Sequence, residues 1–246
     1  MKIVVISDLQ VPFHNPKAVK NVATFIRKFK PDEVLCVGDE MDFNTISKFS
    51  SGFDEHSKTI GRDRDMCVDV MYDLQITQLS RSNHGARLFN ALSTRLPGLI
   101  GAPELEIENF LKLPELGIKY HRKPYEIPGT NWVMVHGDEQ SIKPHGGLTA
   151  LEAAKRHGKS VVCGHTHRQG ISSYTQSSGG LEVSRLTGFE VGHLMDTRST
   201  GASYMKGTFN WQAGFGVIYT DRKRVLPIAV PIEKDGSFQF EGKVYG

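Results

Sequence analysis

Cysteine is scarce in this sequence, which has three among its 246 residues and no Cys-x-x-Cys pair. An odd number of widely spaced thiols argues against a disulfide framework and a zinc knuckle, and it is typical of a reducing compartment. Long apolar runs are absent too, and the first residues form neither a basic leader segment nor a cleavage site. These absences predict a soluble, cytoplasmic protein without a membrane partner.

Neither sign of charge predominates, because 30 Lys and Arg residues and 27 Asp and Glu residues leave a net charge of +3. Such a weak bias permits a nucleic-acid partner but does not by itself indicate one. The sequence contains neither a G-x-S-x-G segment nor a P-loop, which argues against covalent serine catalysis and Walker-type nucleotide hydrolysis. No repeat or linker divides the chain, so we expect residues 1–246 to form a single domain, as a monomer or an oligomer.

The amino-terminal part has the pattern of a βαβ unit. A β-branched run at residues 2–7 predicts a strand covered on both faces, and apolar residues at helical spacing predict a helix over residues 16–29. A second short strand is expected at residues 33–37, directly before Gly38-Asp39. Strand, helix and strand in this order are typical of a parallel sheet, so the predicted fold class is α/β.

The rest of the chain divides into a helical middle and a β-rich end. Further helices are expected at residues 62–79, 86–96, 103–112 and 147–157. Further strands are expected at residues 118–121, 125–127, 132–135, 160–163, 181–188, 214–219, 225–231 and 238–240. Residues 44–58 and 192–211 lack periodicity and are predicted to be loops, and long loops in compact domains are often functional.

Five short segments each place a side chain that can bind metal just after an expected strand. They are Ser7-Asp8-Leu9-Gln10, Gly38-Asp39-Glu40, Ser82-Asn83-His84, Val135-His136-Gly137-Asp138 and Cys163-Gly164-His165-Thr166-His167. Any one of them is weak support, because an Asp after a strand often caps a helix. Together they should gather at the carboxyl ends of the strands. Carboxylate, amide and imidazole groups in one place indicate a site for Mn²⁺, Fe²⁺ or Zn²⁺ rather than Ca²⁺.

In this order the segments resemble the calcineurin-like metallophosphoesterase superfamily, whose usual pattern is D-x-H, G-D, G-N-H-[DE], a single His and then G-H-x-H. The match runs from Asp8 to His167, and G-H-T-H is its most specific part. The resemblance implies a four-layer α/β/β/α sandwich with two mixed β-sheets and two metal ions at the strand ends. The D-x-Q opening and the G-H-L-M-D-T-R-S segment are similar to members from bacteriophage genomes, which implies the host cytoplasm for a phage-encoded protein.

The resemblance also implies a role for each matching residue. Asp8 and His167, with Gln10, would hold a first metal ion, and Asp39 would bridge both ions. The second ion would be held by Asn83, His136 and His165. His84 would stabilise the phosphoryl oxygens or protonate the leaving group. We expect two divalent ions, with Mn²⁺ as the preferred metal and Fe, Zn, Ni or Mg as alternatives.

Two positions depart from the family pattern. Gln10 stands where the family usually has His, so the first ion should bind more weakly, and Zn²⁺ should be less favoured there. Gly85 stands where the family usually has an acid that orients the neighbouring His. His84 is therefore expected to lack an orienting partner and to have a less elevated pKa.

The leading functional hypothesis is a phosphodiesterase that acts on nucleic acid or nucleotides. Two cations can share a hydroxide at neutral pH and clamp the attacking and leaving oxygens of an in-line displacement. Arg87, His145 and Arg168 are the candidate substrate contacts, and Trp211 is a candidate for stacking on a base. The alternatives are a phosphomonoesterase, including a protein phosphatase, and a catalytically weak binding scaffold on the same fold.

Overall fold

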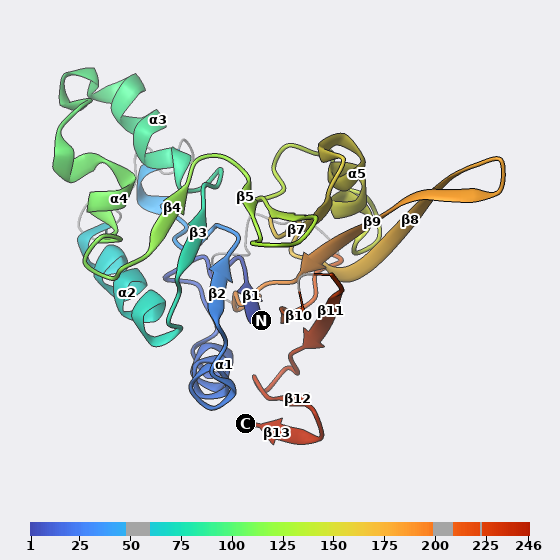
Figure 1. Ribbon diagram of the computed structural model, residues 1–246. Coiled ribbons are helices and arrows are strands. Elements are labelled where there is room, and N and C mark those ends of the chain that lie inside the picture. The colour runs from blue at the N-terminus through green and yellow to red at the C-terminus, as the bar shows by residue number, and fades with distance from the viewer. Residues whose placement is uncertain (48–59, 199–208, 222) are drawn as a thin grey trace.

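The computed structural model describes residues 1–47, 60–198, 209–221 and 223–246 (Figure 1). Most of the predicted loop at residues 44–58, and residues 199–208 of the predicted loop at 192–211, therefore lie outside the described residues. Residues 44–46 form a short 3₁₀ turn, Asn44–Ile46. No helix within the described ranges is long and apolar enough to cross a membrane.

The first sheet has six strands in the order β11-β10-β1-β2-β3-β4. The four parallel strands are β1 (Lys2–Ile6), β2 (Glu33–Cys36), β3 (Gln78–Ser80) and β4 (Lys119–His121). On the other side of β1 lie the antiparallel strands β10 (Gly214–Thr220) and β11 (Val225–Pro231). The sheet is therefore mixed.

The second sheet has five strands in the order β5-β6-β7-β9-β8 and is also mixed. Its strands are β5 (Tyr125–Glu126), β6 (Trp132–Met134), β7 (Ser160–Cys163), β8 (Gln169–Ser178) and β9 (Leu181–Val191). A separate hairpin of β12 (Phe238–Phe240) and β13 (Lys243–Tyr245) follows near the carboxyl terminus. Figure 1 shows the β8–β9 hairpin extending away from the body of the molecule.

Helices cover the outer faces of both sheets. They are α1 (Pro16–Phe29), α2 (Ile60–Asp73), α3 (Ala86–Arg95), α4 (Ile107–Phe110) and α5 (Leu148–His157). Two 3₁₀ turns, Pro97–Leu99 and Pro103–Leu105, join α3 to α4. Residues of α1 and α2 pack in one apolar cluster with the first sheet, and residues of α5 pack in another with the second.

The alternating side chains of β1 show how the layers are joined. Ile3 and Val5 face the second sheet and share a buried cluster with Met134 of β6. Val4 and Ile6 point to the opposite face and belong to the cluster under α1 and α2. A strand with two buried faces requires a continuous apolar run, as the sequence predicted. The predicted four-layer α/β/β/α sandwich is confirmed.

The predicted helix over residues 62–79 is wrong at its carboxyl end. Helix α2 stops at Asp73, and residues 78–80 form β3 instead. Gln75 adopts a left-handed conformation with φ of 52°, and the N–H of Ile76 donates to the carbonyl of Met71, which closes the helix. Leu74 and Leu79 are both buried. The helical spacing of apolar residues therefore continues past the boundary between α2 and β3.

Other differences between the predicted and the observed elements arise where strand pairing or turns outweigh the local sequence pattern. Residues 103–112 form the 3₁₀ turn Pro103–Leu105 and the short α4 rather than one helix. Strand β8 and strand β13 were not predicted, and β9 continues to Val191 rather than ending at residue 188. Strand β8 is polar, and its ladder with β9 stabilises it rather than an apolar alternation.

Candidate metal centre

Five of the predicted metal-binding residues have a strained backbone. Asp8, Gln10, Asp39, His165 and His167 have φ angles between 49° and 65°. The left-handed conformation is uncommon outside glycine and costs of order 1–3 kcal/mol per residue. Each of these residues follows a strand end, at one edge of the paired sheets. Strain gathered in this way is typical of a functional site.

Two glycines allow the strand ends to approach one another. A Cβ atom on Gly164 would lie 1.7 Å from Oγ of Ser7 and 2.6 Å from Oδ2 of Asp8. A Cβ atom on Gly38 would lie 2.7 Å from Nδ1 of His136. The glycines of the G-H-T-H and G-D segments are therefore needed for close packing of the site.

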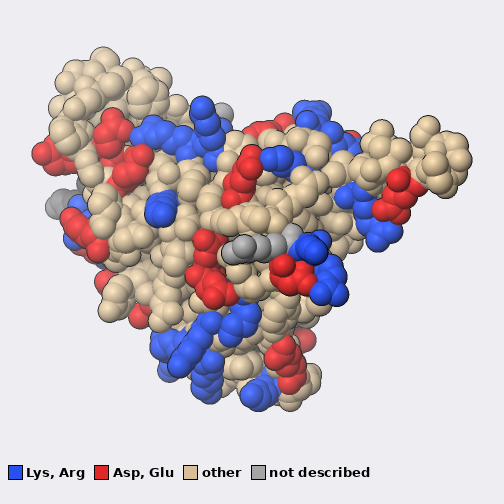
Figure 2. Space-filling view, viewed as in Figure 1, with Lys and Arg blue, Asp and Glu red and all other residues tan. Residues whose placement is uncertain are grey.

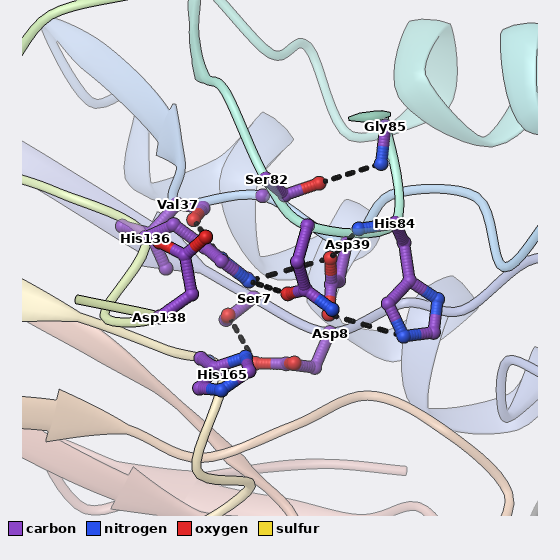
Figure 3. A network of polar contacts seen from close by, with 12 residues as sticks. Ser7, Asp8, Val37, Asp39, Ser82, His84, Gly85, His136, Asp138 and His165 are labelled. Carbon is purple, nitrogen blue, oxygen red and sulfur yellow. Dashed lines mark hydrogen bonds and ion pairs between the residues drawn. The ribbon is translucent and has the colours of Figure 1, made fainter. Parts of the chain in front are cut away.

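The predicted residues of the second metal ion form a compact group (Figure 3). Asp39, His136 and His165 each offer one ligand atom, and these atoms all lie within 4.8 Å of one another. The ring of His136 is held at both nitrogens, with Nδ1 2.8 Å from the carbonyl of Val37 and Nε2 2.7 Å from Oδ1 of Asn83. A divalent ion fits this donor set of one carboxylate, two imidazoles and an amide oxygen.

The predicted residues of the first metal ion lie on the other side of Asp39. Oδ1 of Asp8 is 3.1 Å from Nε2 of His167. Gln10 donates from Nε2 to Oδ2 of Asp39 at 3.2 Å, whereas Oδ1 of Asp39 lies 3.4 Å from Nε2 of His136. The two oxygens of Asp39 thus face the two predicted metal sites separately. Among the described residues, the buried Oε1 atom of Gln10 has no hydrogen-bond partner. This is expected for an oxygen that would ligate a metal ion.

The electrostatics of the group also favour a bound cation. Burial acts to raise the pKa of Asp39, but His136 and His84 outweigh burial and hold that pKa well below its usual value. The pKa of His136 is raised to about 9, since Asp39 outweighs the burial that would lower it. Asp39 and His136 therefore favour opposite charges on each other in this buried position. The centre can accept further positive charge, because Asp8 is also buried and its pKa is lowered, mainly by His167 against burial.

His84 has an orienting acid, contrary to the expectation from Gly85. Its Nδ1 lies 3.1 Å from the backbone carbonyl and 3.4 Å from Oδ2 of Asp42. Burial lowers the pKa of His84, but Asp39 and Asp42 outweigh burial and raise it above its usual value. Nε2 of His84 lies 3.8 Å from Asp39 and 2.9 Å from Nη2 of Arg87. The expected loss of orientation is therefore wrong, because Asp42, an acid from another part of the chain, contacts Nδ1 of the ring.

The three predicted substrate contacts have different surroundings. Arg87 lies beside the centre, with Nη1 2.6 Å from the carbonyl of Asp42. Arg168 donates from Nη1 to the carbonyl of Lys143, so its guanidinium is used at least in part to hold that loop. His145 is exposed before α5. Trp211, the candidate for base stacking, packs edge-on against His167 with ring centroids 4.4 Å apart.

The sequence interpretation missed Glu190, a fully buried carboxylate in β9 that anchors the G-H-T-H turn. Its Oε2 accepts a hydrogen bond of 2.6 Å from Oγ1 of Thr166. Its Oε1 accepts from the backbone N–H groups of Thr149 and Ala150 at the start of α5. A charged residue between the apolar Phe189 and Val191 was the available signal, since such a charge is rarely buried without partners.

No protein-family model matches the chain. The Gene 54 protein of Mycobacterium phage D29 is 36% identical over 99% of this chain and 98% of its own length, and the Gene 54 protein of Mycobacterium phage L5 is 35% identical over the same shares. The chain belongs to the family of these Gene 54 proteins. Vps29 of Chaetomium thermophilum matches the structure with a TM-score of 0.50 at 11% identity, over 100% of this chain and 98% of Vps29.

The fold is thus that of the calcineurin-like metallophosphoesterases, as the order of motifs predicted. The Asp39, His136 and His165 group of this Gene 54 relative is a possible site for a divalent metal ion. The identity and number of the ions, and the roles of the single residues, remain predictions.

The position of Gln10 leads to a test of the first metal site. We expect Gln10→His to strengthen Zn²⁺ binding there roughly tenfold, about 1.4 kcal/mol, and to strengthen Mn²⁺ binding less. The reason is that imidazole is a stronger donor than an amide for Zn²⁺. Calorimetric titration of both ions checks this, with Gln10→Asn as the control that keeps an amide. An unchanged or weaker first site would mean that Gln10 does not face the ion.

The contact between Glu190 and Thr166 leads to a second test. We expect Thr166→Val to lower metal affinity or kcat/KM by about 10–100-fold, the usual effect of removing a partner that orients metal ligands. Thr166→Ser keeps the hydroxyl and should stay near the parent. Calorimetry and steady-state kinetics on both variants separate the hydrogen bond from methyl packing. A loss in Thr166→Ser with none in Thr166→Val would assign the effect to the methyl group.

Proposed function

We propose that this protein is a metal-dependent phosphodiesterase that acts on nucleic acid or nucleotide phosphodiesters. The observation that carries the proposal is the placement of Asp39. One of its oxygens faces His136 and the other faces Gln10, so a single carboxylate stands between two groups of donors. Two divalent ions, when bound, would supply an activated water and neutralise charge on the phosphoryl group.

The residues of the chain would divide the remaining work. Asp8, Gln10 and His167 would hold one ion, and Asn83, His136 and His165 the other, with Asp39 between them. His84 stands at the rim, where its side chain is 13% exposed, and would give a proton or a hydrogen bond to the leaving oxygen.

Arg87 is the best-placed cation for the substrate phosphate. Its side chain is 27% exposed, and its guanidinium reaches both His84 and Asp42. A phosphate would compete with His84 for Nη2 of Arg87, because guanidinium binds phosphate through paired hydrogen bonds. Binding of the substrate would then free Nε2 of His84 for the leaving group.

Support for a nucleotide or nucleic-acid substrate comes from charge and from the rim. The net charge of +3 does not oppose a polyanion. Trp211 and Phe209 pack together with ring centroids 4.6 Å apart, beside His167, and offer an aromatic surface near the centre.

The decisive experiment is a metal-dependent assay of the full chain. The protein is stripped with a chelator, loaded with Mn²⁺, and assayed with bis-p-nitrophenyl phosphate and with p-nitrophenyl phosphate. We expect hydrolysis of the diester to require Mn²⁺ and to exceed that of the monoester. Faster hydrolysis of the monoester would contradict the proposal and indicate a phosphomonoesterase.

A binding scaffold on the same fold is the second candidate, and Gln10 is the observation that favours it. An amide at this position weakens the first metal site, and one weak site would remove the paired action of two ions. The scaffold predicts that calorimetry detects metal binding while neither ester is hydrolysed.

A further inference from the structure

A cavity of about 260 Å³ lies beside the centre, between α3, the turns that follow it, and β4. Its apolar walls come from Leu88, Phe89 and Leu92 of α3, from Leu99 and Ile100, and from Tyr120. Ser82 and Gly85 also line it. These two residues flank Asn83 and His84 in the sequence, so one turn contributes both to the cavity and to the predicted site of chemistry.

Several large apolar side chains are exposed around this cavity. Phe89 is 59% exposed, Leu99 45% and Ile100 46%. Figure 2 shows the same area, at the upper left where α3 lies in Figure 1, as mostly uncharged surface with Lys and Arg at its edge toward the middle of the molecule. A contiguous apolar area next to a cavity is typical of a surface that binds a ligand or a partner.

Two arginines stand among the lining residues. Arg81 donates from Nη2 to Asp138 at 2.9 Å. Arg122 donates from Nη2 to Glu108 at 2.9 Å, and its guanidinium lies 5.8 Å from the centre of the Tyr120 ring. Both side chains are more than 40% exposed. The cavity thus combines an aromatic wall and aliphatic walls with Glu106 and two arginines that are paired with acids, a lining that suits the flat ring of a base rather than its phosphate.

We propose that this cavity binds the base of a nucleotide whose phosphodiester lies at the metal centre. The proposal rests on the proposed phosphodiesterase function and adds the source of its specificity. Ser82–Gly85 is the link, because the same short turn contributes lining residues to the cavity and carries Asn83 and His84. A cavity of about 260 Å³ suits one small ring system and is too small for a peptide helix.

The test compares two diesters with the same leaving group and the same charge, p-nitrophenyl thymidine 5′-phosphate and p-nitrophenyl methyl phosphate. Ala102, which also lines the cavity, is replaced by Trp to fill it, and Phe89→Ala removes one wall. Tyr72→Ala is the matched control, since Tyr72 is 71% exposed on α2 and does not line the cavity.

We expect the parent protein to prefer the thymidine ester by roughly tenfold in kcat/KM, the effect of about one base-stacking contact. Ala102→Trp and Phe89→Ala should lose this preference and keep their activity on the methyl ester, and Tyr72→Ala should change neither. Equal preference in parent and Ala102→Trp would overturn the proposal. It would also be overturned if only Trp211→Ala lost the preference, because the base would then stack on Trp211, which does not line the cavity.

A binding measurement keeps this result separate from the proposed function. Thymidine 5′-monophosphate is titrated into the Mn²⁺-loaded protein by calorimetry. Binding that Ala102→Trp weakens tenfold would support the base site even if neither diester were hydrolysed, and the phosphodiesterase proposal alone would fail. Binding that Ala102→Trp leaves unchanged would remove the base site, whatever the activity.

Discussion

Asp39→Asn is expected to lower kcat/KM for a diester by about a thousandfold or more. The carboxylate has one oxygen toward His136 and one toward Gln10, so its neutralisation weakens both predicted metal sites at once. Stabilisation by metal ions contributes several kcal/mol to the transition state, and each 1.36 kcal/mol corresponds to a factor of ten. Steady-state kinetics with metal analysis of the purified variant measures both effects.

The matched control for this variant is Asp63→Asn. Asp63 is also a buried carboxylate, but it lies in the first turn of α2. Its replacement tests whether the loss of any buried negative charge damages the protein, which circular dichroism would show independently. Near-normal turnover of Asp39→Asn with full metal content would refute the bridging role.

His84→Asn is expected to retain metal binding and to lose roughly 10²–10⁴ in rate, the usual contribution of a positioned acid. Asp42 holds Nδ1 of the ring, and with Asp39 it raises the pKa of His84 against the effect of burial. The loss should be larger for a diester with an alkoxide leaving group than for a p-nitrophenyl ester. p-Nitrophenolate departs without a proton, whereas an alkoxide needs one.

The two leaving groups are best compared in a matched pair of diesters, with metal content measured in the parent and in the variant. Arg87→Gln is the companion variant, because it removes the guanidinium that lies 2.9 Å from Nε2 of His84. Arg87→Gln should raise KM for both esters without changing which of the two is hydrolysed faster. Equal losses for both leaving groups in His84→Asn would exclude general acid catalysis, and no loss would place His84 outside the active site.

Local pattern predicted those parts of the fold in which neighbouring residues determine the structure. The continuous apolar run of β1 and the helical spacing of α1 follow from which side chains must be buried. The boundary between α2 and β3 was missed, because Leu74 and Leu79 fit either a helix or a strand until the left-handed Gln75 ends the helix. Strand β8 was missed because its stability comes from pairing with β9.

The sequence by itself determined which side chains that can bind metal follow which strand ends, and in what order. Because parallel strands bring their carboxyl ends to one edge, that order predicted where these side chains gather. The four-layer fold followed from the resemblance of the same segments to the calcineurin-like metallophosphoesterases. Only the tertiary structure decided that Asp42 orients His84, that Glu190 holds Thr166 and that a cavity lies beside Gly85. These features join residues up to 42 positions apart in the chain. Such contacts depend on how sheets, helices and turns pack, and a local sequence pattern carries no record of that packing.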